Sequence, residues 1–214
     1  MILRDLYLWA CERLYHELAP SYDLVSRLVS AGAWPRWRRL ALAHVHGSRL
    51  LEIGFGTGEL LAEAVGRGWD VTGLELSPAM HAVAAARPGL AAARVQARAQ
   101  AMPFACASFD SILATFPAPY ILEPATLCEC RRVLRSGGRL VVAGLWVRLA
   151  RPELRPLAPV FYADPPVAQL EAIACRLQEA GFQAAWHWAA MGWAELPILV
   201  GTVPSADGPG LASG

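Results

Sequence analysis

The sequence contains no lysine and no asparagine, and it shows no excess of charge of one sign. Nineteen arginines face 18 acidic residues along 214 residues, which leaves a formal net charge of +1. The charged residues are scattered, so the broad basic face that duplex nucleic acid requires is excluded. We therefore expect no duplex nucleic acid among the partners.

Uncharged apolar runs of membrane-spanning length are also lacking. The apolar start of the chain is interrupted by Arg4, Asp5, Glu12 and Arg13, which excludes a signal-peptide core or a spanning helix there. We expect a cytoplasmic protein without a transmembrane segment.

Cysteines spaced as zinc ligands are missing too. The five cysteines are an odd set, and the close pair Cys128 and Cys130 has no second pair at ligand spacing. Buried or idle thiols are the better interpretation, and we expect no metal site.

Apolar residues, in contrast, make up 55% of the sequence. A chain of this length and composition can bury one full core, so we expect a single domain over 1–204. Residues 1–46 are expected to form an N-terminal helical cap and 47–204 the core, whereas 205–214 lack apolar anchors and are expected to be disordered. The composition allows a monomer or a homodimer.

Short apolar runs and helical periodicity alternate after residue 46. We expect strands near 49–53, 70–74, 93–97, 110–115 and 139–145, and helices near 58–66, 78–87, 123–135 and 167–180. The segments GFQAAWHWAAMG and ELPILVGTVP then predict a terminal hairpin. The order predicts an α/β fold: a mostly parallel seven-stranded sheet with helices on both faces, an antiparallel last strand and an N-terminal helical cap.

Capping signals mark three helix boundaries. Ser77 followed by Pro78 is typical of a helix start, and Ser21 is a candidate cap for a helix beginning at Tyr22. The glycine pair 137–138 is expected to end a helix before the next strand. These are signals for element boundaries and not for a site.

Residues 50–60, LLEIGFGTGEL, place three glycines between an expected strand and an expected helix. Glycine lets the backbone approach a ligand closely and adopts positive φ at little cost. A tight turn with no ligand is the alternative, because glycine clusters are weak signals without context. Here the next strand delivers Glu75 about twenty residues on, where dinucleotide-type folds use an acid to accept ribose hydroxyls.

The spacing of these glycines disfavours a nicotinamide dinucleotide. A G-x-G-x-x-G motif needs a third glycine at position 59, which is Glu59, and Glu52 adds another acid beside the turn. Phosphate sites favour amide donors without nearby negative charge. S-Adenosylmethionine fits better, since it carries an ammonium, a sulfonium and a ribose diol but no phosphate.

From Tyr15 to Pro204 the sequence resembles a class I S-adenosylmethionine-dependent methyltransferase of the type-11 group. The resemblance rests on LLEIGFGTGEL, on Glu75, on RAQAMPFACASFDSILATF and on CRRVLRSGGRLVVAG. It implies a Rossmann-like fold, S-adenosylmethionine as cofactor, S-adenosylhomocysteine as product and a small-molecule acceptor. The cofactor-binding residues that it implies are Glu52, Gly54, Phe55, Gly56, Gly58, Glu75, Leu76, Met80, Ala99, Gln100 and Thr115.

The stretch YHELAPSYDLVSRLVSAGAWPRWRR is similar to the start of the ubiquinone/menaquinone-biosynthesis C-methyltransferases. That similarity makes Tyr15 and Tyr22 candidates for contacts with the methionine end of the cofactor. A buried aromatic followed by a helix-turn acid, Asp23, is an equally good interpretation of the second tyrosine.

One position departs from the family pattern. Where the family has an acid that accepts from the adenine amino group, this chain has Arg98, which cannot accept a hydrogen bond. We expect Arg98 to lie against the adenine or to point to solvent, with the adenine recognised by the backbone at Ala99 and by Gln100.

The acceptor is expected near the end of the fourth strand, because open parallel sheets bind ligands there. The segment ATFPAPYI faintly resembles the D/N-P-P-Y signature of amino-group methyltransferases, but Phe116 stands where the polar residue is needed. Phe116, Pro117 and Tyr120 are therefore expected to form an apolar pocket wall.

The proline-rich stretch after the fifth strand is long enough to act as a lid. Trp146, Phe161 and Tyr162 are its candidate acceptor contacts, with packing under a loop as the alternative. Neither His16 nor His187 has a partner acid in view, so no catalytic base is assigned.

The segment PRWRRL at 35–40 interleaves Trp37 with three arginines. A patch for phosphates, RNA or a membrane surface is one interpretation. A solvated helix face is favoured, because the chain as a whole is nearly neutral.

These patterns together predict an S-adenosylmethionine-dependent methyltransferase. Its expected acceptor is a C, O or N atom of a small apolar or aromatic metabolite. A nicotinamide-dependent oxidoreductase and a non-catalytic S-adenosylmethionine-binding protein are the alternatives, and fold analogy cannot decide the acceptor.

Overall fold

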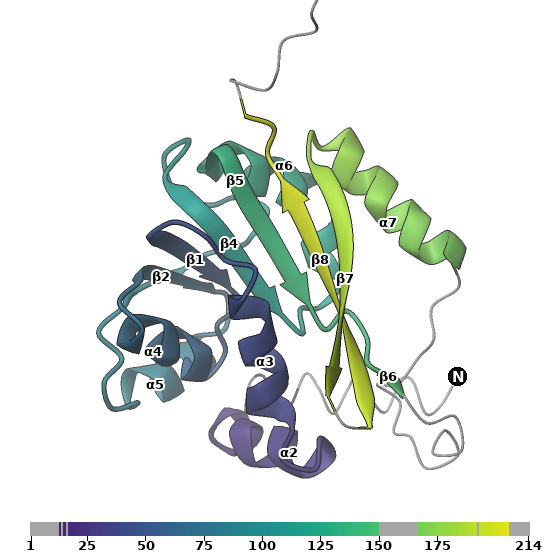
Figure 1. Cartoon of the computed structure of the whole chain (residues 1–214). Helices are drawn as coiled ribbons and strands as arrows, with labels where there is room; N and C mark the ends of the chain where they lie inside the picture. The colour runs from purple at the N-terminus through teal and green to yellow at the C-terminus, as the bar shows by residue number, and fades with distance from the viewer. Residues whose placement is uncertain (1–12, 14, 16, 150–166, 192, 206–214) are drawn as a thin grey trace, which may run out of the picture.

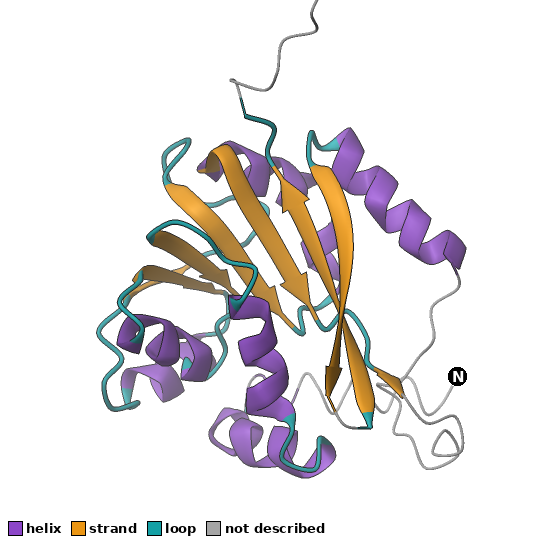
Figure 2. Cartoon of the chain, viewed as in Figure 1, coloured by secondary structure: helices purple, strands orange, loops and turns teal. Residues whose placement is uncertain are grey.

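The computed structural model describes residues 13, 15, 17–149, 167–191 and 193–205. Within them an open sheet carries helices on both faces, as Figure 2 shows. The predicted lid contacts Phe161 and Tyr162, the histidine His16 and the predicted tail beyond residue 205 lie outside the described residues.

Eight strands make up the sheet in these ranges, seven long ones and a two-residue one. They are β1 (Arg49–Ile53), β2 (Asp70–Glu75), β3 (Ala93–Gln96), β4 (Phe109–Thr115), β5 (Leu134–Ala143), β6 (Arg148–Leu149), β7 (Gln183–Met191) and β8 (Ala194–Thr202). Their order is β3-β2-β1-β4-β5-β8-β6, and β7 also pairs with β8 (Figure 1). Neighbours from β3 to β5 are parallel, whereas β8 runs antiparallel to β5, β6 and β7. The mostly parallel sheet, the terminal hairpin and the antiparallel last strand are confirmed, and β6 is an addition to the seven strands expected.

The helices alternate with the strands as the periodicity predicts. They are η1 (Ala19–Ser21), α2 (Tyr22–Val29), α3 (Trp34–Leu42), α4 (Glu59–Gly66), α5 (Pro78–Ala85), η2 (Pro119–Leu122), α6 (Pro124–Val133) and α7 (Val167–Glu179). No helix in the described part of the chain is long and apolar enough to cross a membrane.

Successive residues of the central strand β4 alternate between two cores. Ile112 and Ala114 belong to the cluster that α6 and α7 cover, and Leu113 belongs to the cluster that α3, α4 and α5 cover. All residues of β4 are buried. A strand reads as a continuous apolar run when helices cover both faces of a parallel sheet.

The capping signals have mixed outcomes. Helix α5 begins as predicted, because the Met80 backbone N–H donates to the Ser77 hydroxyl at 3.3 Å. Ser21 stands at the start of α2, but its side chain makes no capping hydrogen bond. Helix α6 ends at Val133, so the prediction that it runs on to the glycine pair was wrong. The chain enters β5 at once, at Leu134, and bulges there against β4.

The N-terminal cap, formed by η1, α2 and α3, packs beside the first half of the sheet (Figure 1). Helix α3 contacts β4, β5 and α4, and η1 contacts α5. Trp37 and Ala41 bury the inner face of α3 in the core. The cap is therefore held on the same edge of the sheet as the glycine turn that precedes α4.

Candidate functional site

A cavity of about 390 Å³ opens where β1, β2 and β4 end. Open parallel sheets bind ligands at this edge, and the volume suits a small molecule. Most of the predicted site residues lie around it. Those that line the cavity are Tyr15, Tyr22, Gly54, Phe55, Gly56, Glu75, Leu76, Ala99, Gln100, Thr115, Phe116, Pro117 and Tyr120.

Four other predicted residues do not line the cavity. Glu52 is buried two residues before the glycine turn, and Gly58 caps the start of α4. Met80 is fully buried in α5. Trp146 packs in the core against Trp186, with ring centroids 5.6 Å apart. This packing agrees with the alternative role of Trp146, and its contact with the acceptor stays a prediction.

The three glycines of the turn between β1 and α4 all have positive φ, +69° at Gly54, +57° at Gly56 and +75° at Gly58. A Cβ on Gly54 would lie 2.9 Å from the Tyr120 hydroxyl, and one on Gly58 would lie 2.7 Å from Leu90. A Cβ on Gly56 would meet nothing within 4 Å. Two glycines are thus needed for packing, whereas the backbone at the middle one faces open space where a ligand can approach.

Glu75, the last residue of β2, holds its carboxylate at the cavity wall and is 9% exposed. The carboxylate accepts the backbone N–H of Gly56 at 3.1 Å, of Leu76 at 2.8 Å and of Ser77 at 2.9 Å. These bonds tie it to the glycine turn and to the start of α5. A carboxylate has about four lone-pair sites, so capacity remains for a ligand hydroxyl.

Arg38 of α3 reaches the same edge from the cap. Its guanidinium lies 3.3 Å from the buried Glu52 carboxylate and donates to the Thr115 hydroxyl at 3.2 Å. Burial raises the pKa of Glu52 to about 7, although the Arg38 charge opposes the rise. Arg38 also lines the cavity, so it supplies a buried cation beside a carboxyl that titrates near neutral pH.

The sequence interpretation of PRWRRL as a solvated face was wrong for two of its residues. Trp37 and Arg38 are buried, and only the flanking arginines, such as Arg39, are exposed. A signal was present in the sequence: Ala41 and Leu42 follow the two buried residues by four positions. That spacing places all four residues on one apolar stripe of α3.

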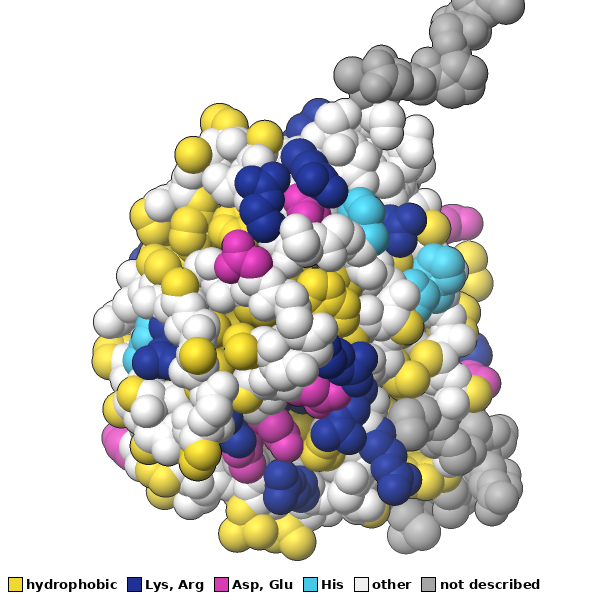
Figure 3. All heavy atoms as spheres, turned by 60° about the vertical axis from the view of Figure 1, so that its left-hand side comes forward, with side chains coloured by type: hydrophobic (Ala, Val, Ile, Leu, Met, Phe, Trp, Pro, Cys, Tyr) yellow, Lys and Arg dark blue, Asp and Glu magenta, His cyan; other side chains and the backbone are white. Residues whose placement is uncertain are grey.

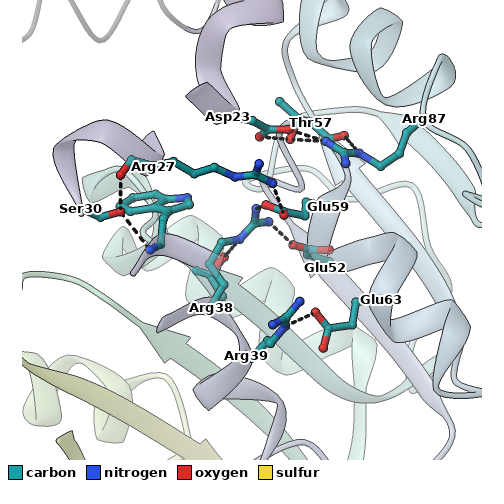
Figure 4. Close-up of polar contacts among 12 residues, drawn as sticks. Asp23, Arg27, Ser30, Arg38, Arg39, Glu52, Thr57, Glu59, Glu63 and Arg87 are labelled. Carbon is teal, nitrogen blue, oxygen red and sulfur yellow. Dashed lines mark hydrogen bonds and ion pairs between the residues drawn. The ribbon is translucent and has the colours of Figure 1, made fainter. Parts of the chain in front are cut away.

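Polar contacts fasten the cap to the glycine turn, as Figure 4 shows. Asp23 of α2 accepts from the Thr57 hydroxyl at 2.6 Å and from the Arg87 guanidinium, which also donates to the Thr57 carbonyl at 2.7 Å. Arg27 reaches Glu59 at 3.1 Å. These partners lie 30 to 64 positions apart in the sequence, which is why sequence reasoning missed Thr57 and Arg87.

Aromatic rings form a row along the cap side of the cavity. The ring centroids of Tyr15 and Tyr22 are 5.5 Å apart, those of Tyr22 and Trp34 are 6.5 Å apart, and Trp34 stacks on Phe116 at 4.0 Å. Phe116 has φ +49°, a strained value for a bulky residue, and its ring fills the space that a Cβ on Gly144 would need. Backbone strain at a strand end is a common mark of a functional position.

Two tyrosines of the lining are kept protonated by their surroundings. Burial raises the pKa of Tyr22 and of Tyr120, and the nearby Glu75 charge raises that of Tyr120 further. Among the described lining residues there is no histidine, cysteine or aspartate, and the described residues contain no cluster that could hold a metal ion. The described cavity is thus equipped for binding and positioning.

The segment after β3 forms the wall nearest Leu76. Arg98 is exposed and lines the cavity, so it lies at the mouth. Ala99 is buried beside it, and the Gln100 amide donates to Glu123 at 2.8 Å. One donor of Gln100 is therefore already used within the protein.

Comparisons with known proteins agree with this geometry. A family model described as a methyltransferase domain matches residues 51–142. The demethylmenaquinone methyltransferase of Renibacterium salmoninarum is 34% identical over 168 residues, which are 76% of this chain and 68% of that protein. That of Thermus thermophilus is 38% identical over 138 residues, 60% of this chain and 63% of the relative, so less than two thirds of its length is spanned.

The fold has solved counterparts. A putative S-adenosyl-L-methionine-dependent methyltransferase from Methanococcus maripaludis matches with a TM-score of 0.64 and 17% identity, over 91% of this chain and 96% of that one. At this identity the likeness shows the fold alone.

Proposed function

Because the chain belongs to the class I S-adenosylmethionine-dependent methyltransferases, we propose that its acceptor is a small apolar molecule with a planar, quinone-like ring. The observation that carries the proposal is the stack of Trp34 on Phe116 in the cavity wall where β4 ends. Two relatives are named for the methylation of demethylmenaquinone. Those names support a ring acceptor here.

The residues around the cavity fit S-adenosylmethionine, whose sulfonium supplies an already activated methyl group. In this proposal Glu75 accepts a ribose hydroxyl through its remaining lone pair, and Leu76 packs on the adenine. The open backbone at Gly56 and the turn around it lie along the methionine end. Arg38 faces the carboxylate of that end, since it is the buried cation of the described lining.

At the acceptor end the protein orients the acceptor and excludes water. Methyl transfer forms a bond from the acceptor atom to the methyl carbon, breaks the sulfur–methyl bond and releases a proton from the acceptor. Trp34, Phe116 and Pro117 offer flat apolar surfaces that orient a ring and exclude water. Because the described lining offers no base with an ordinary pKa near neutrality, we propose an acceptor that is itself electron-rich, such as a reduced quinone.

The test is product analysis by mass spectrometry. The protein is incubated with S-adenosylmethionine and either a reduced demethylmenaquinone with a short prenyl tail or an aromatic amine of similar size. We expect a ring-methylated quinol and no methylated amine. Phe116→Ala should lower kcat/KM by about tenfold, because it removes the stacked ring, and leave the Kd for S-adenosylmethionine unchanged.

Trp188→Leu is the matched control, since Trp188 is a partly exposed ring on β7 that does not line the cavity. Its activity should equal that of the wild type. Methylation of the amine alone, or full activity in Phe116→Ala, would contradict the proposed acceptor.

Family membership removes the oxidoreductase alternative. Binding of S-adenosylmethionine without any methylated product from a wide acceptor panel would favour the non-catalytic alternative. The cytoplasmic location and the choice between monomer and homodimer stay predictions from the sequence.

A further inference from the structure

Exposed apolar side chains gather on the N-terminal cap. Among the described residues, seven large hydrophobic side chains are exposed. Four of them lie in the cap between positions 18 and 29: Leu18 at 50%, Leu24 at 62%, Leu28 at 72% and Val29 at 43%. Single exposed leucines are ordinary, but a cluster of this kind marks an interaction surface.

Helix α2 turns opposite faces to the cavity and to the outside. Tyr22 lines the cavity and Ser26 is buried, whereas Leu24 and Leu28, one helical turn apart, stand out from the protein. We call Leu18, Leu24 and Leu28 the leucine ridge. In Figure 3 hydrophobic atoms gather at the lower end of the molecule, the end at which Figure 1 shows α2. The ridge therefore lies on the outer face of the cap, and Tyr22 on the opposite face of α2 lines the cavity.

The charge of the cap differs from that of the whole chain. Residues 21–42 contain four arginines and one acid, Asp23, although the chain as a whole carries only +1. Arg36 is exposed, whereas Arg38 is buried against Glu52. The side chains of Arg27 and Arg39 are 55% and 50% exposed, although they pair with Glu59 and Glu63 of α4. In Figure 3 both dark blue and magenta side chains lie above the hydrophobic atoms at this end. Apolar residues flanked by arginines are the composition of a helix that lies on an anionic lipid surface.

We propose that the leucine ridge docks the cap on an anionic membrane surface, with Leu24 and Leu28 inserted among the lipids. The purpose of this docking rests on the proposed function, because an apolar acceptor dissolved in lipid would then enter the cavity beside α2 without crossing water. A second copy of the chain fits less well, since the arginines of one copy would face those of the other.

The test measures co-sedimentation with vesicles, without cofactor or acceptor. Vesicles of phosphatidylcholine mixed with phosphatidylglycerol should bind the wild type. The double variant Leu24→Glu with Leu28→Glu should bind at least about tenfold more weakly, because it lacks the two leucine side chains that would be buried in the lipid. Val167→Glu is the matched control: Val167 is 69% exposed but lies on α7, outside the cap, and its binding should equal that of the wild type.

Arg36→Glu adds a second, milder variant that should weaken binding to the anionic vesicles and not to pure phosphatidylcholine. Equal binding of the wild type and the double variant, or no binding of either, would overturn the proposal. So would a change from dimer to monomer in light scattering of the double variant, which would make the ridge an interface between copies.

The two proposals fail separately. If the docking proposal is wrong, the double variant binds vesicles as the wild type does, while methylation of a water-soluble short-tailed acceptor is unaffected. If the acceptor proposal is wrong, vesicle binding persists without any methylated quinol.

Discussion

The two edges of the sheet treat buried carboxyl groups in opposite ways. At the amino edge Asp110 accepts the backbone N–H groups of Ser48 at 2.7 Å and Arg49 at 3.0 Å, and it pairs with Arg135 at 2.9 Å. Burial alone would raise the pKa of Asp110, but these donors and the two arginines lower it below the ordinary value. Its hydrogen-bonding capacity is used within the protein.

At the carboxyl edge the carboxyl groups are less completely satisfied. Glu52 has one basic partner within hydrogen-bonding distance, Arg38, and its pKa is raised by burial to about 7. Glu75 faces the cavity with capacity to spare. In this sheet a buried acid therefore marks a site only where its partners leave it open to a ligand.

The largest expected effect is the loss of stability when Asp110 at the amino edge is replaced. Asp110→Ala leaves two backbone donors and Arg135 without their acceptor, so the free energy of unfolding should fall by about 3 kcal/mol. Urea unfolding measures the loss. The Kd for S-adenosylmethionine, measured by calorimetry on the folded variant, should stay within about threefold of the wild type, and a large loss of affinity would show that the two edges are coupled.

The next largest effect is the loss of cofactor affinity when Glu75 at the carboxyl edge is replaced. Glu75→Ala removes the proposed acceptor of a ribose hydroxyl, and a charged hydrogen bond of this kind predicts a Kd about 30-fold higher. Calorimetric titration with S-adenosylhomocysteine measures it, and Glu171→Ala is the control, because Glu171 is an exposed acid of α7 that does not line the cavity. An unchanged Kd in Glu75→Ala would remove Glu75 from the site.

The pH dependence of stability distinguishes the buried acids at the two edges, Glu52 and Asp110. Burial raises the pKa of Glu52 from 4.5 to about 7 in the folded protein. Between these pH values the folded protein keeps a proton that the unfolded chain loses. Protonated Glu52 therefore contributes stability below about pH 4.5, and this stability is lost as pH rises through 7. The loss of free energy of unfolding should be at most about 3 kcal/mol. Glu52→Gln should flatten the slope in urea unfolding over this window.

Asp110 provides the opposite sign in the same experiment. Its lowered pKa contributes stability that is present above the ordinary value and is lost as pH falls through the folded one. The two contributions therefore fall in different windows. If the free energy of unfolding falls as steeply between pH 4.5 and 7 in Glu52→Gln as in the wild type, Glu52 is not the group that causes the fall.

The smallest expected effect concerns Arg98 at the cavity mouth. Arg98→Asp should change the Kd for S-adenosylmethionine by no more than about threefold, because the side chain is exposed and its interactions are screened. Calorimetry measures this change as well. A change of about 100-fold in either direction would mean that Arg98 is part of the adenine site.

Much of the fold was readable from local pattern. The apolar run at 49–53 coincides with β1, and the predicted helix at 58–66 differs from α4 by one residue. Their part of the site could be predicted from Gly54, Gly56 and Glu75, because strand ends and turn residues are local features of the sequence. The early end of α6 and the short β6 depend on pairing with β4 and β8, which no local signal shows.

The cap contribution to the site could not be read in the same way. Arg38 meets Glu52 across 14 positions, and Arg87 meets Asp23 across 64. Their partners depend on how the cap packs, since charged residues at helical spacing look alike whether they face water or a carboxylate. The positive φ of Phe116 is likewise imposed by the structure around it.

A crystal structure of the protein with S-adenosylhomocysteine tests most directly whether the carboxyl edge of the sheet binds the cofactor through Glu75. We expect a ribose hydroxyl within hydrogen-bonding distance of the Glu75 carboxylate, with the thioether sulfur directed toward Trp34 and Phe116. A bound ligand whose ribose lies beyond the reach of Glu75, or whose sulfur points away from the stacked rings, would contradict it.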